Sequence, residues 1–216
     1  MNLVYYFALS YLIGAFPSAV VLGRMLRGVD VRRHGSGNAG GTNAWRVLGW
    51  KIGVPVMLLD VAKGAICAAG ISRLPLGPVP VDPQTLAVLC GLVAVLGHVF
   101  PVYIGFRGGK GVGTAAGMLI ATAPIPVAFA AAAFALCLFS FGCVSCGSML
   151  AAWTVPVSIL LLNWLSTIQH PLVLTIITLA LAVFITITHR KNIGRILRRE
   201  EKTFPQVQLW KRWIRR

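Results

Sequence analysis

Acidic residues are scarce in this 216-residue chain, which has five Asp and Glu against twenty Lys and Arg, for a net charge of +15. Charged residues of either sign make up only 12% of the sequence, against roughly 25% in soluble domains, while 57% of the residues are hydrophobic. This balance excludes an ordinary soluble protein and places most of the chain in lipid. The basic residues lie between apolar segments, so anionic headgroups and anionic substrates suit them better than nucleic acid.

Motifs for metal or nucleotide chemistry are missing as well. The sequence has no HExxH motif, and Cys143-x-x-Cys146 has neither a second pair nor a nearby histidine, so we interpret the cysteines as packing thiols. Gly35-x-Gly37-x-x-Gly40 has the spacing of a dinucleotide fingerprint, but no buried strand precedes it. The GGKG at 108–111 lacks the first glycine and the Ser/Thr of a Walker loop. We therefore expect no metal and no cofactor.

Seven apolar stretches, separated by Pro- and Gly-rich breaks, are candidates for transmembrane helices. They lie at 3–23, 52–72, 84–100, 112–125, 127–141, 148–165 and 171–188. The fourth and fifth are short for complete spans, so six helices are the alternative to seven. We predict an all-α integral membrane protein that forms one transmembrane domain over 1–216, a bundle of about seven helices.

The basic residues predict the orientation of this bundle. If the N-terminus is outside, the segments 24–51, 101–111, 142–147 and 189–216 face the cytoplasm, and they contain all twenty basic residues except Lys63 and Arg73. Because cytoplasmic loops are enriched in Lys and Arg, we predict an outside N-terminus and a cytoplasmic C-terminus. The segment 204–216 is interpreted either as an interfacial basic and aromatic tail or as a frayed charged end.

The nine residues GSGNAGGTN, 35–43, form the most polar stretch between two long apolar ones, and Arg46 follows them. Small side chains and glycine-freed amides are typical of anion-binding loops, especially where a helix N-terminus follows. On its own such a loop is often only a tight turn. Its place on the predicted cytoplasmic face favours a phosphate-bearing ligand.

Other polar clusters fall on the same predicted face. They are His98 with FRGGKG at 106–111, Ser145 with Ser148 in a predicted loop after the fifth helix, and HRKNIGR at 189–195. Each has a purely structural interpretation, such as a cap or a topology signal. Their coincidence on one face predicts a functional site.

Asp60 and Lys63 lie one helical turn apart within the second apolar stretch. Charged side chains in lipid must face the bundle interior or water. Two interpretations stand: the residues pair and lock the bundle, or Lys63 adds to an anion pocket in which Asp60 orients it.

Together these motifs resemble the bacterial acyl-phosphate:glycerol-3-phosphate acyltransferase family. The family's three signature blocks occur in order at 35–43, 97–114 and 189–201, and the Asp-x-x-Lys-Gly of 60–64 is similar as well. The resemblance spans nearly the whole chain.

The chain departs from the family pattern at a few positions. Gly41 and Gly113 stand where the family usually has Ala, and Arg199 stands where it usually has Gly. Gly142 and Cys146 replace an expected Arg and Leu around Ser145, which leaves the role of Ser145 open.

The resemblance implies an enzyme of phospholipid synthesis in the bacterial inner membrane, with its active site on the cytoplasmic side. It would transfer an acyl group from acyl-phosphate to the 1-hydroxyl of sn-glycerol 3-phosphate, giving lysophosphatidic acid and phosphate, without a metal or a covalent acyl-enzyme. Its partners would be these substrates and membrane lipids, without nucleic acid, in a chain expected to act as a monomer. The alternatives are a transporter of an anionic phosphorylated metabolite and a lipid phosphatase.

The resemblance also implies roles for individual residues. The predicted catalytic residues are Ser36, His98, His189 and Asn192. The predicted substrate-binding residues are Gly37, Asn38, Gly40, Thr42, Asn43, Arg46, Lys63, Gly108, Gly109, Lys110 and Ser145. The loop at 35–43 would cradle the acyl-phosphate, and Arg46 with Lys110 would bind the phosphate of glycerol 3-phosphate. The histidines would orient the hydroxyl or relay its proton, for which the substrate phosphate is the alternative acceptor.

Overall fold

The computed structural model describes residues 2–165 and 168–208. Every regular element in these ranges is a helix, which confirms the prediction of an all-α chain. The helices fall into two compact units, Met1–Ala123 (unit 1) and Pro124–Arg216 (unit 2), and each unit is described by itself.

The described part of the chain contains five segments long and apolar enough to cross a membrane. They are Leu3–Arg27, Trp50–Arg73, Pro83–Ile104, Pro124–Phe141 and Val144–Trp164. A sixth is obtained if Leu172–Thr188 and Arg190–Leu197, bent by 58°, count as one span. The remaining apolar helix, Val112–Thr122, has 11 residues, which at about 1.5 Å per residue covers only about half of a ~30 Å hydrocarbon core. All seven predicted apolar stretches are thus helical, and five or six are candidate spans.

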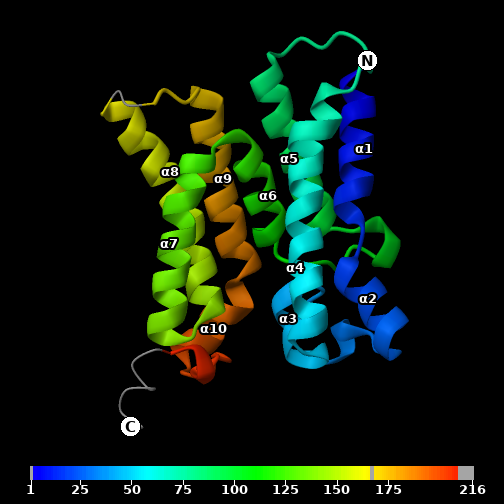
Figure 1. Cartoon of the computed structure of the whole chain (residues 1–216), viewed down its shortest axis with the longest axis vertical. Coiled ribbons are helices and arrows are strands. Elements are labelled where there is room, and N and C mark those ends of the chain that lie inside the picture. The colour runs from blue at the N-terminus through cyan, green and yellow to red at the C-terminus, as the bar shows by residue number, and fades with distance from the viewer. Residues whose placement is uncertain (1, 166–167, 209–216) are drawn as a thin grey trace. The chain divides into compact units, whose positions relative to one another are not determined.

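Unit 1 begins with a broken helix, because Pro17 has no N–H group with which to continue the helical ladder. The two parts are α1 (Leu3–Ala15) and α2 (Ser18–Arg27). The helices that follow are η1 (Val31–Arg33), α3 (Gly41–Leu48), α4 (Trp50–Ala65), η2 (Ile66–Gly70), η3 (Ile71–Arg73), α5 (Pro83–Val99), η4 (Val102–Ile104) and α6 (Val112–Thr122). In unit 1, α1 packs on α5, and α4 packs on both α3 and α6 (Figure 1).

Small residues allow the helices of unit 1 to approach closely. A Cβ atom on Gly64 of α4 would overlap the carbonyl oxygen of Thr114 in α6, and one on Gly117 would overlap that of Val61. In lipid, helix association depends on such packing because the hydrophobic effect gives no preference for a neighbouring helix over lipid tails. This close approach fixes Lys63 and Asp60 on α4 relative to α6.

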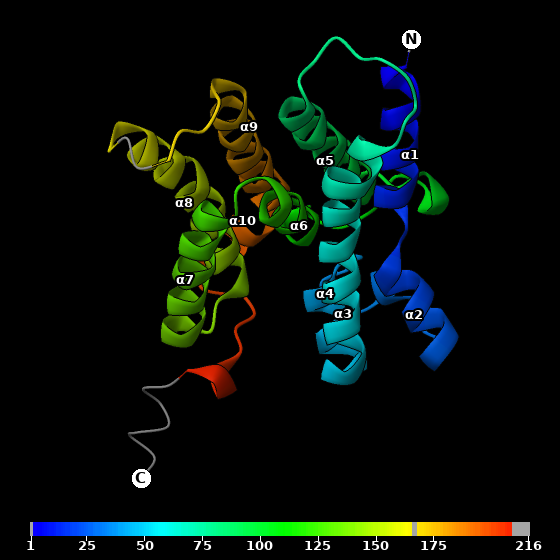
Figure 2. The ribbon, with the colours of Figure 1, turned by 45° about the horizontal axis from the view of Figure 1, so that its top comes forward.

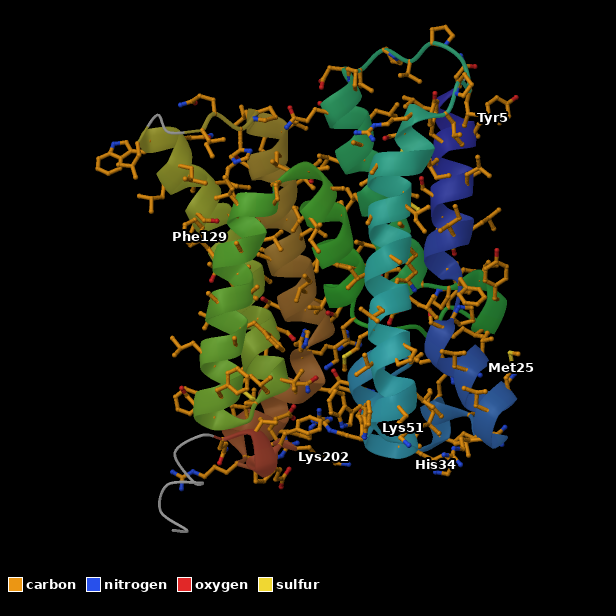
Figure 3. The ribbon with its side chains drawn as sticks, viewed as in Figure 1. Tyr5, Met25, His34, Lys51, Phe129 and Lys202 are labelled. Atoms are coloured by element: carbon orange, nitrogen blue, oxygen red, sulfur yellow. A yellow bond between two sulfur atoms is a disulfide. The ribbon has the colours of Figure 1, made fainter. Side chains whose placement is uncertain are left out.

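The two ends of unit 1 carry different segments. The connection 74–82 lies beside the start of α1, where Tyr6 Oη donates a hydrogen bond to the Leu74 carbonyl oxygen at 2.6 Å. Figure 3 shows Tyr5 at this end, and His34 and Lys51 at the opposite end. The basic segment between α2 and α4 is therefore far from the connection 74–82.

The described part of unit 2 contains four α-helices and a short 3₁₀ turn. They are α7 (Pro124–Phe141), α8 (Val144–Trp164), α9 (Leu172–Thr188), α10 (Arg190–Leu197) and η5 (Pro205–Val207). Helix α8 packs against α7 and α9 (Figure 2). The chain after α10 folds back to the start of α8, because the Phe204 amide donates to the Gly142 carbonyl at 2.8 Å. Most of the predicted tail, residues 209–216, lies outside the described residues.

Candidate active site

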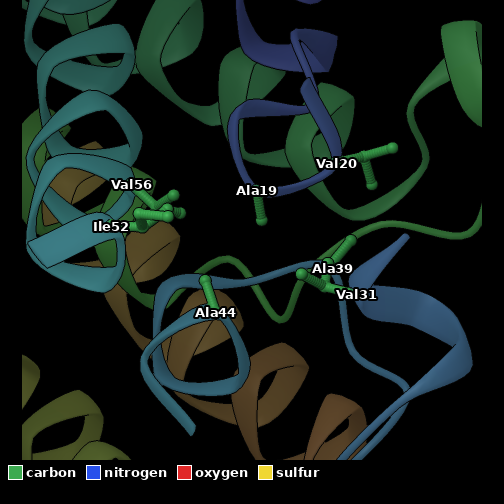
Figure 4. Packing of buried hydrophobic residues seen from close by; sticks show 7 residues of the cluster. All are labelled: Ala19, Val20, Val31, Ala39, Ala44, Ile52 and Val56. Atoms are coloured by element: carbon green, nitrogen blue, oxygen red, sulfur yellow. The ribbon is translucent and has the colours of Figure 1, made fainter. Parts of the chain in front are cut away.

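The glycine loop, defined as residues 35–43, is held to unit 1 by a cluster of small buried apolar side chains. The cluster consists of Ala19, Val20, Val31, Ala39, Ala44, Ile52 and Val56 (Figure 4). Gly35 and Gly37 have φ values of 65° and 73°, which side chains with a Cβ rarely adopt. The loop leads into the first turn of α3, with Gly40 as the N-cap, a short helix that was not predicted from the sequence.

Asn43 organises the loop from within. Its side chain is buried, at 2% exposure, and its Oδ1 accepts a hydrogen bond from the Ser36 amide at 2.8 Å. Its Nδ2 lies 2.8, 3.1 and 3.0 Å from the carbonyl oxygens of Val31, His34 and Asn38. Asn43 therefore sets the shape of the loop, while Ser36 is on its exposed side.

A salt-bridged arginine joins the segment before the glycine loop to the second signature block. Asp30 forms ion pairs with Arg24 and Arg32, each with an N–O distance of 2.8 Å, and Arg32 Nη1 donates to the Ile104 carbonyl of η4 at 2.9 Å. The hydrogen bonds from Arg32 hold the pKa of the Asp30 carboxyl well below its usual value. Asp30 therefore stays ionised at neutral pH and keeps its ion pairs with Arg24 and Arg32.

The FRGGKG segment, residues 106–111, crosses the C-terminal end of α5. The Gly108 amide donates to the Val99 carbonyl and the Gly109 amide to the His98 carbonyl, both at 3.1 Å. A Cβ on Gly109 would overlap Nε2 of His98. The absence of a side chain at position 109 thus lets the segment lie directly on the His98 ring.

Asp60 is the centre of a buried polar cluster. Its Oδ1 accepts a hydrogen bond from Ser18 Oγ at 3.1 Å and lies 3.0 Å from Lys63 Nζ and 3.5 Å from His98 Nδ1. These four side chains are 1–6% exposed. Lys63 also donates to the Phe16 carbonyl at the break between α1 and α2, at 3.1 Å. The predicted pair of Asp60 and Lys63 is therefore present, and the His98 ring lies beside it.

Two hollows in unit 1 meet at this cluster. One is a narrow polar cleft, closed too tightly to admit a water molecule, whose lining includes Ser18, Lys63, His98 and Gly109. The other is a groove of about 390 Å³ between α1, α4 and η4. It is lined by Leu12, Ile13, Phe16, Leu59, Ala62, Lys63, Ile66 and Tyr103, which are apolar apart from Lys63 and the Tyr103 hydroxyl. Phe16 and Lys63 line both hollows.

A second buried carboxylate, Glu201, organises unit 2. It accepts hydrogen bonds from Ser145 Oγ at 2.7 Å, Asn192 Nδ2 at 2.6 Å and Arg195 Nε at 2.7 Å. Burial alone would raise the pKa of Glu201, but the hydrogen bonds from these three side chains outweigh it and lower the pKa below the usual value. Two predicted site residues, Ser145 and Asn192, are thus held by one acceptor.

The predicted loop around Ser145 is wrong. Helix α8 begins at Val144, with Cys143 as the N-cap, so Ser145 and Ser148 lie in its first turns. The cap forms because Cys143 Sγ accepts a hydrogen bond from the Cys146 amide. Cys143 and Cys146 also form a disulfide, which corrects their interpretation as packing thiols, whereas Cys67, Cys90 and Cys137 are free and buried.

The bend at His189 separates α9 from α10. The ring is buried, and its Nδ1 lies 2.8 Å from the Ile185 carbonyl oxygen. His189 is therefore the N-cap residue of α10, at the junction where the two helices meet at 58°.

The structure therefore gathers the predicted residues into two groups. Lys63, His98, Gly108 and Gly109 line one cleft in unit 1. Ser145 and Asn192 share Glu201 in unit 2. Thr42, Arg46 and Lys110 are half-buried.

Sequence reasoning missed Ser18 and Glu201. Pro17 within an apolar stretch was the available signal for the first, and a carboxylate in a strongly basic segment was the signal for the second.

Comparison with known proteins decides the family. The model of the family described as "Glycerol-3-phosphate acyltransferase" matches residues 4–199. The chain belongs to this family of integral membrane enzymes. The acyltransferase is 42% identical over 224 residues to a glycerol-3-phosphate acyltransferase of Chlorobium phaeobacteroides strain BS1, covering 93% of this chain and 95% of the relative. It is also 42% identical to the glycerol-3-phosphate acyltransferase of Chlorobaculum tepidum, and the match covers 87% of this chain and 90% of that relative.

Two solved structures share the fold of the acyltransferase. Both are crystal structures of PlsY, described as an integral membrane glycerol 3-phosphate acyltransferase, in its glycerol 3-phosphate and lysophosphatidic acid forms. Their TM-scores to this chain are 0.81 and 0.80, and both are 30% identical to it in sequence. Each match covers 96% of this chain and 98% of the PlsY chain. Family membership makes the acyltransferase an enzyme of phospholipid synthesis, so the transporter and phosphatase alternatives are set aside.

Proposed function

We propose that the acyltransferase moves an acyl group from an acyl-phosphate to the 1-hydroxyl of sn-glycerol 3-phosphate, releasing lysophosphatidic acid and phosphate. The observation that carries this proposal is the meeting of the polar cleft and the apolar groove at Phe16 and Lys63. An acyl-phosphate has an anionic head on an apolar chain, so it matches such a junction. The glycerol 3-phosphate and lysophosphatidic acid forms of PlsY support the choice of acceptor and product.

The donor's head is assigned to Lys63 and to the glycine loop, and its chain to the apolar groove. Asn43 shapes this loop, and we assign the side chains of Ser36, Asn38 and Thr42 and the Gly40 amide to the anion. The Gly37 amide already donates to the His34 carbonyl at 3.0 Å, so Gly37 contributes through its backbone conformation. Hydrogen bonds to charged groups contribute about 1.5–3 kcal/mol each, so a few of them hold a dianion at the junction.

The acceptor's phosphate is assigned to Arg46 and Lys110, which follow the glycine loop and the two glycines 108–109. His98 is assigned to the acceptor's hydroxyl. In unit 2, Ser145, His189 and Asn192 remain proposed site residues, and their burial supports fixed orientations. Phosphate is a good leaving group, so positioning and stabilisation of the oxyanion supply the catalysis without a metal or an acyl-enzyme.

The active site is proposed to face the cytoplasm of the bacterial inner membrane, with the N-terminus outside. In unit 1 the contact between Arg32 and Ile104 brings the basic segments before α3 and before α6 together. In unit 2 the contact between Phe204 and Gly142 holds the chain that follows the basic helix α10 against the start of α8. Each unit thus has a basic end, as the positive-inside rule requires of the cytoplasmic side.

The experiment incubates the purified enzyme in detergent with labelled glycerol 3-phosphate and one of three donors: palmitoyl phosphate, palmitoyl-CoA or palmitoyl-acyl carrier protein. We expect lysophosphatidic acid from palmitoyl phosphate alone, with one phosphate released per product. Comparable product from either thioester would show that the donor is wrong. Product from none of the three, with uptake of glycerol 3-phosphate into proteoliposomes, would overturn the enzymatic function itself.

A further inference from the structure

The disulfide between Cys143 and Cys146 lies where a permanent disulfide is unusual. The proposed topology places residues 142–147 on the cytoplasmic side of the membrane, where thiols are kept reduced. Disulfides in such a compartment are usually transient, and they serve catalysis or redox sensing. We therefore expect this disulfide to open and close in the working enzyme.

The two cysteines share the first turn of α8. Cys143 is the N-cap residue, and Cys146 is the third residue of the helix. Their Cα atoms are 5.4 Å apart, which is within the usual range for a disulfide. The N-terminus of a helix also stabilises a thiolate, the reactive form of cysteine. The position of the pair thus favours exchange with other thiols.

The two cysteines differ in their access to solvent. Cys143 is buried, at 5% exposure, and the chain at 204–208 crosses the adjoining Gly142. A Cβ on Gly142 would lie 2.8 Å from the Phe204 carbonyl oxygen. Cys146 is partly exposed. A soluble reagent therefore reaches Cys146 first, and Cys143 is placed to complete the exchange.

Ser145 lies between the two cysteines and connects them to the proposed site of unit 2. Its Oγ is 3.4 Å from Cys143 Sγ and donates to Glu201 at 2.7 Å, and Glu201 also accepts from Asn192 at 2.6 Å. When the disulfide opens, the first turn loses its covalent closure and is held by hydrogen bonds such as the one from the Cys146 amide to Cys143 Sγ, at 3.3 Å. The state of the sulfurs therefore affects how firmly Ser145 is held, and through Glu201 how firmly Asn192 is held.

We propose that Cys143 and Cys146 are a reversible thiol–disulfide site that exchanges with soluble disulfides of the glutathione type and sets the activity of the enzyme. This inference rests on the proposed function, which supplies the cytoplasmic location and the role of Ser145. In the oxidising direction, the Cys146 thiolate attacks one sulfur of the soluble disulfide and releases the first thiol. Cys143 then loses its proton and attacks the Cys146 sulfur, which closes the protein disulfide and releases the second thiol. The two cysteines lose two electrons and two protons, which the soluble disulfide gains as it becomes two thiols.

The exchange is tested on the purified enzyme in detergent, equilibrated without oxygen in buffers of varied ratio of reduced to oxidised glutathione. A maleimide mass tag, added after denaturation, measures the oxidised fraction. We expect the wild type to pass from oxidised to reduced within this series. The control Cys137→Ala, which removes a buried free thiol, should follow the same curve.

Two results of this titration would overturn the proposal. A protein that stays oxidised in a large excess of reduced glutathione has a structural disulfide. A protein that stays reduced in oxidised glutathione alone has two packing thiols.

The effect on activity is tested with the donor that supports turnover of the wild-type enzyme. Reduction with dithiothreitol should lower kcat about tenfold, the effect of weakening one hydrogen bond to a charged group, and oxidised glutathione should restore it. Cys146→Ala, which cannot form the disulfide, should have the kcat of the reduced enzyme before and after dithiothreitol. Equal kcat of the oxidised and reduced wild type would show that the pair does not set the activity.

A structural measurement is independent of the donor. Hydrogen-exchange mass spectrometry should show faster amide exchange over the first turns of α8 in the reduced wild type, and the same faster exchange in Cys146→Ala. Equal protection in the two redox states would refute the link from the sulfurs to Ser145. Failure of the wild-type enzyme with palmitoyl phosphate would refute the proposed function, while the glutathione titration and the exchange measurement would stand.

Discussion

Changing Asn43 to Asp tests whether one buried amide sets the shape of the glycine loop. The substitution keeps the volume of the side chain and the acceptor for the Ser36 amide. It replaces the Nδ2 donor with a carboxylate oxygen that faces three carbonyl oxygens at 2.8–3.1 Å. Because an oxygen cannot donate to these carbonyls and is repelled by them, the loop must open or the aspartate must be protonated.

The expected size follows from the contacts. Two to three neutral hydrogen bonds at about 1 kcal/mol each amount to about 2–3 kcal/mol, or a factor on the order of 100 in the equilibrium between the native and the open loop. The kcat/KM for glycerol 3-phosphate should fall by about that factor, and amide exchange over residues 31–43 should accelerate. Both are measured on purified protein in detergent, by a product assay and by hydrogen-exchange mass spectrometry.

A matched control is available in unit 2. The Asn163 side chain also joins backbone groups, accepting from the His170 amide at 2.8 Å and donating to its carbonyl at 3.0 Å. Asn163→Asp should speed exchange near residue 170 and leave kcat/KM within about threefold of wild type. Normal turnover and unchanged protection of the loop in Asn43→Asp would refute the organising role of Asn43.

Three further predictions concern charge, packing and topology. Glu201→Gln should lower the melting temperature at neutral pH. Because the folded-state pKa of Glu201 is depressed, the ionised carboxylate stabilises the fold fully above the unfolded pKa near 4.5, and this stabilisation is lost as pH falls. A difference in melting temperature between wild type and variant that stays the same in acid would contradict this. Gly64→Ala should destabilise unit 1 by about 1–3 kcal/mol through overpacking against α6. The control Gly70→Ala, whose Cβ would have no atom closer than 3.9 Å, should melt like the wild type. Equal melting temperatures of the two variants would show that the close contact at Gly64 is not required. In intact spheroplasts a membrane-impermeant maleimide should label Val79→Cys but label Arg33→Cys only after permeabilisation, and the reverse pattern would invert the proposed topology.

The helices were predictable because lipid offers backbone groups no hydrogen-bonding partner, so long apolar stretches must be helical. Their ends were less predictable. The prolines of 123–126 suggested a loop, yet α7 begins at Pro124, since a proline in the first turn removes only an N–H that has no partner there. Likewise, the Gly- and Cys-rich segment after α7 starts a helix at once, through the cap at Cys143.

The candidate site was predictable to the level of its motifs but not of its contacts. Sequence spacing indicates that Asp60 and Lys63 share a helical face, and it says nothing of the approach of Ser18 or His98, which are 42 and 38 positions away from Asp60 in the numbering. Such contacts depend on how helices pack, which is decided by small residues such as Gly64. Asn43 shows the same limit of sequence analysis. Its amide side chain in a polar loop predicted a contact with substrate, and only the structure shows that this side chain is buried and supports the loop.

The break between α1 and α2 has a consequence for how the protein is made. The Phe16 carbonyl at the break receives a hydrogen bond from Lys63, a residue synthesised about forty-seven positions later. Because backbone polar groups without partners are costly in lipid, we expect the first segment to enter the membrane before its bend is fully supported. The bend and the cleft beside it would then be completed together, when α4 arrives and places Lys63 against Phe16.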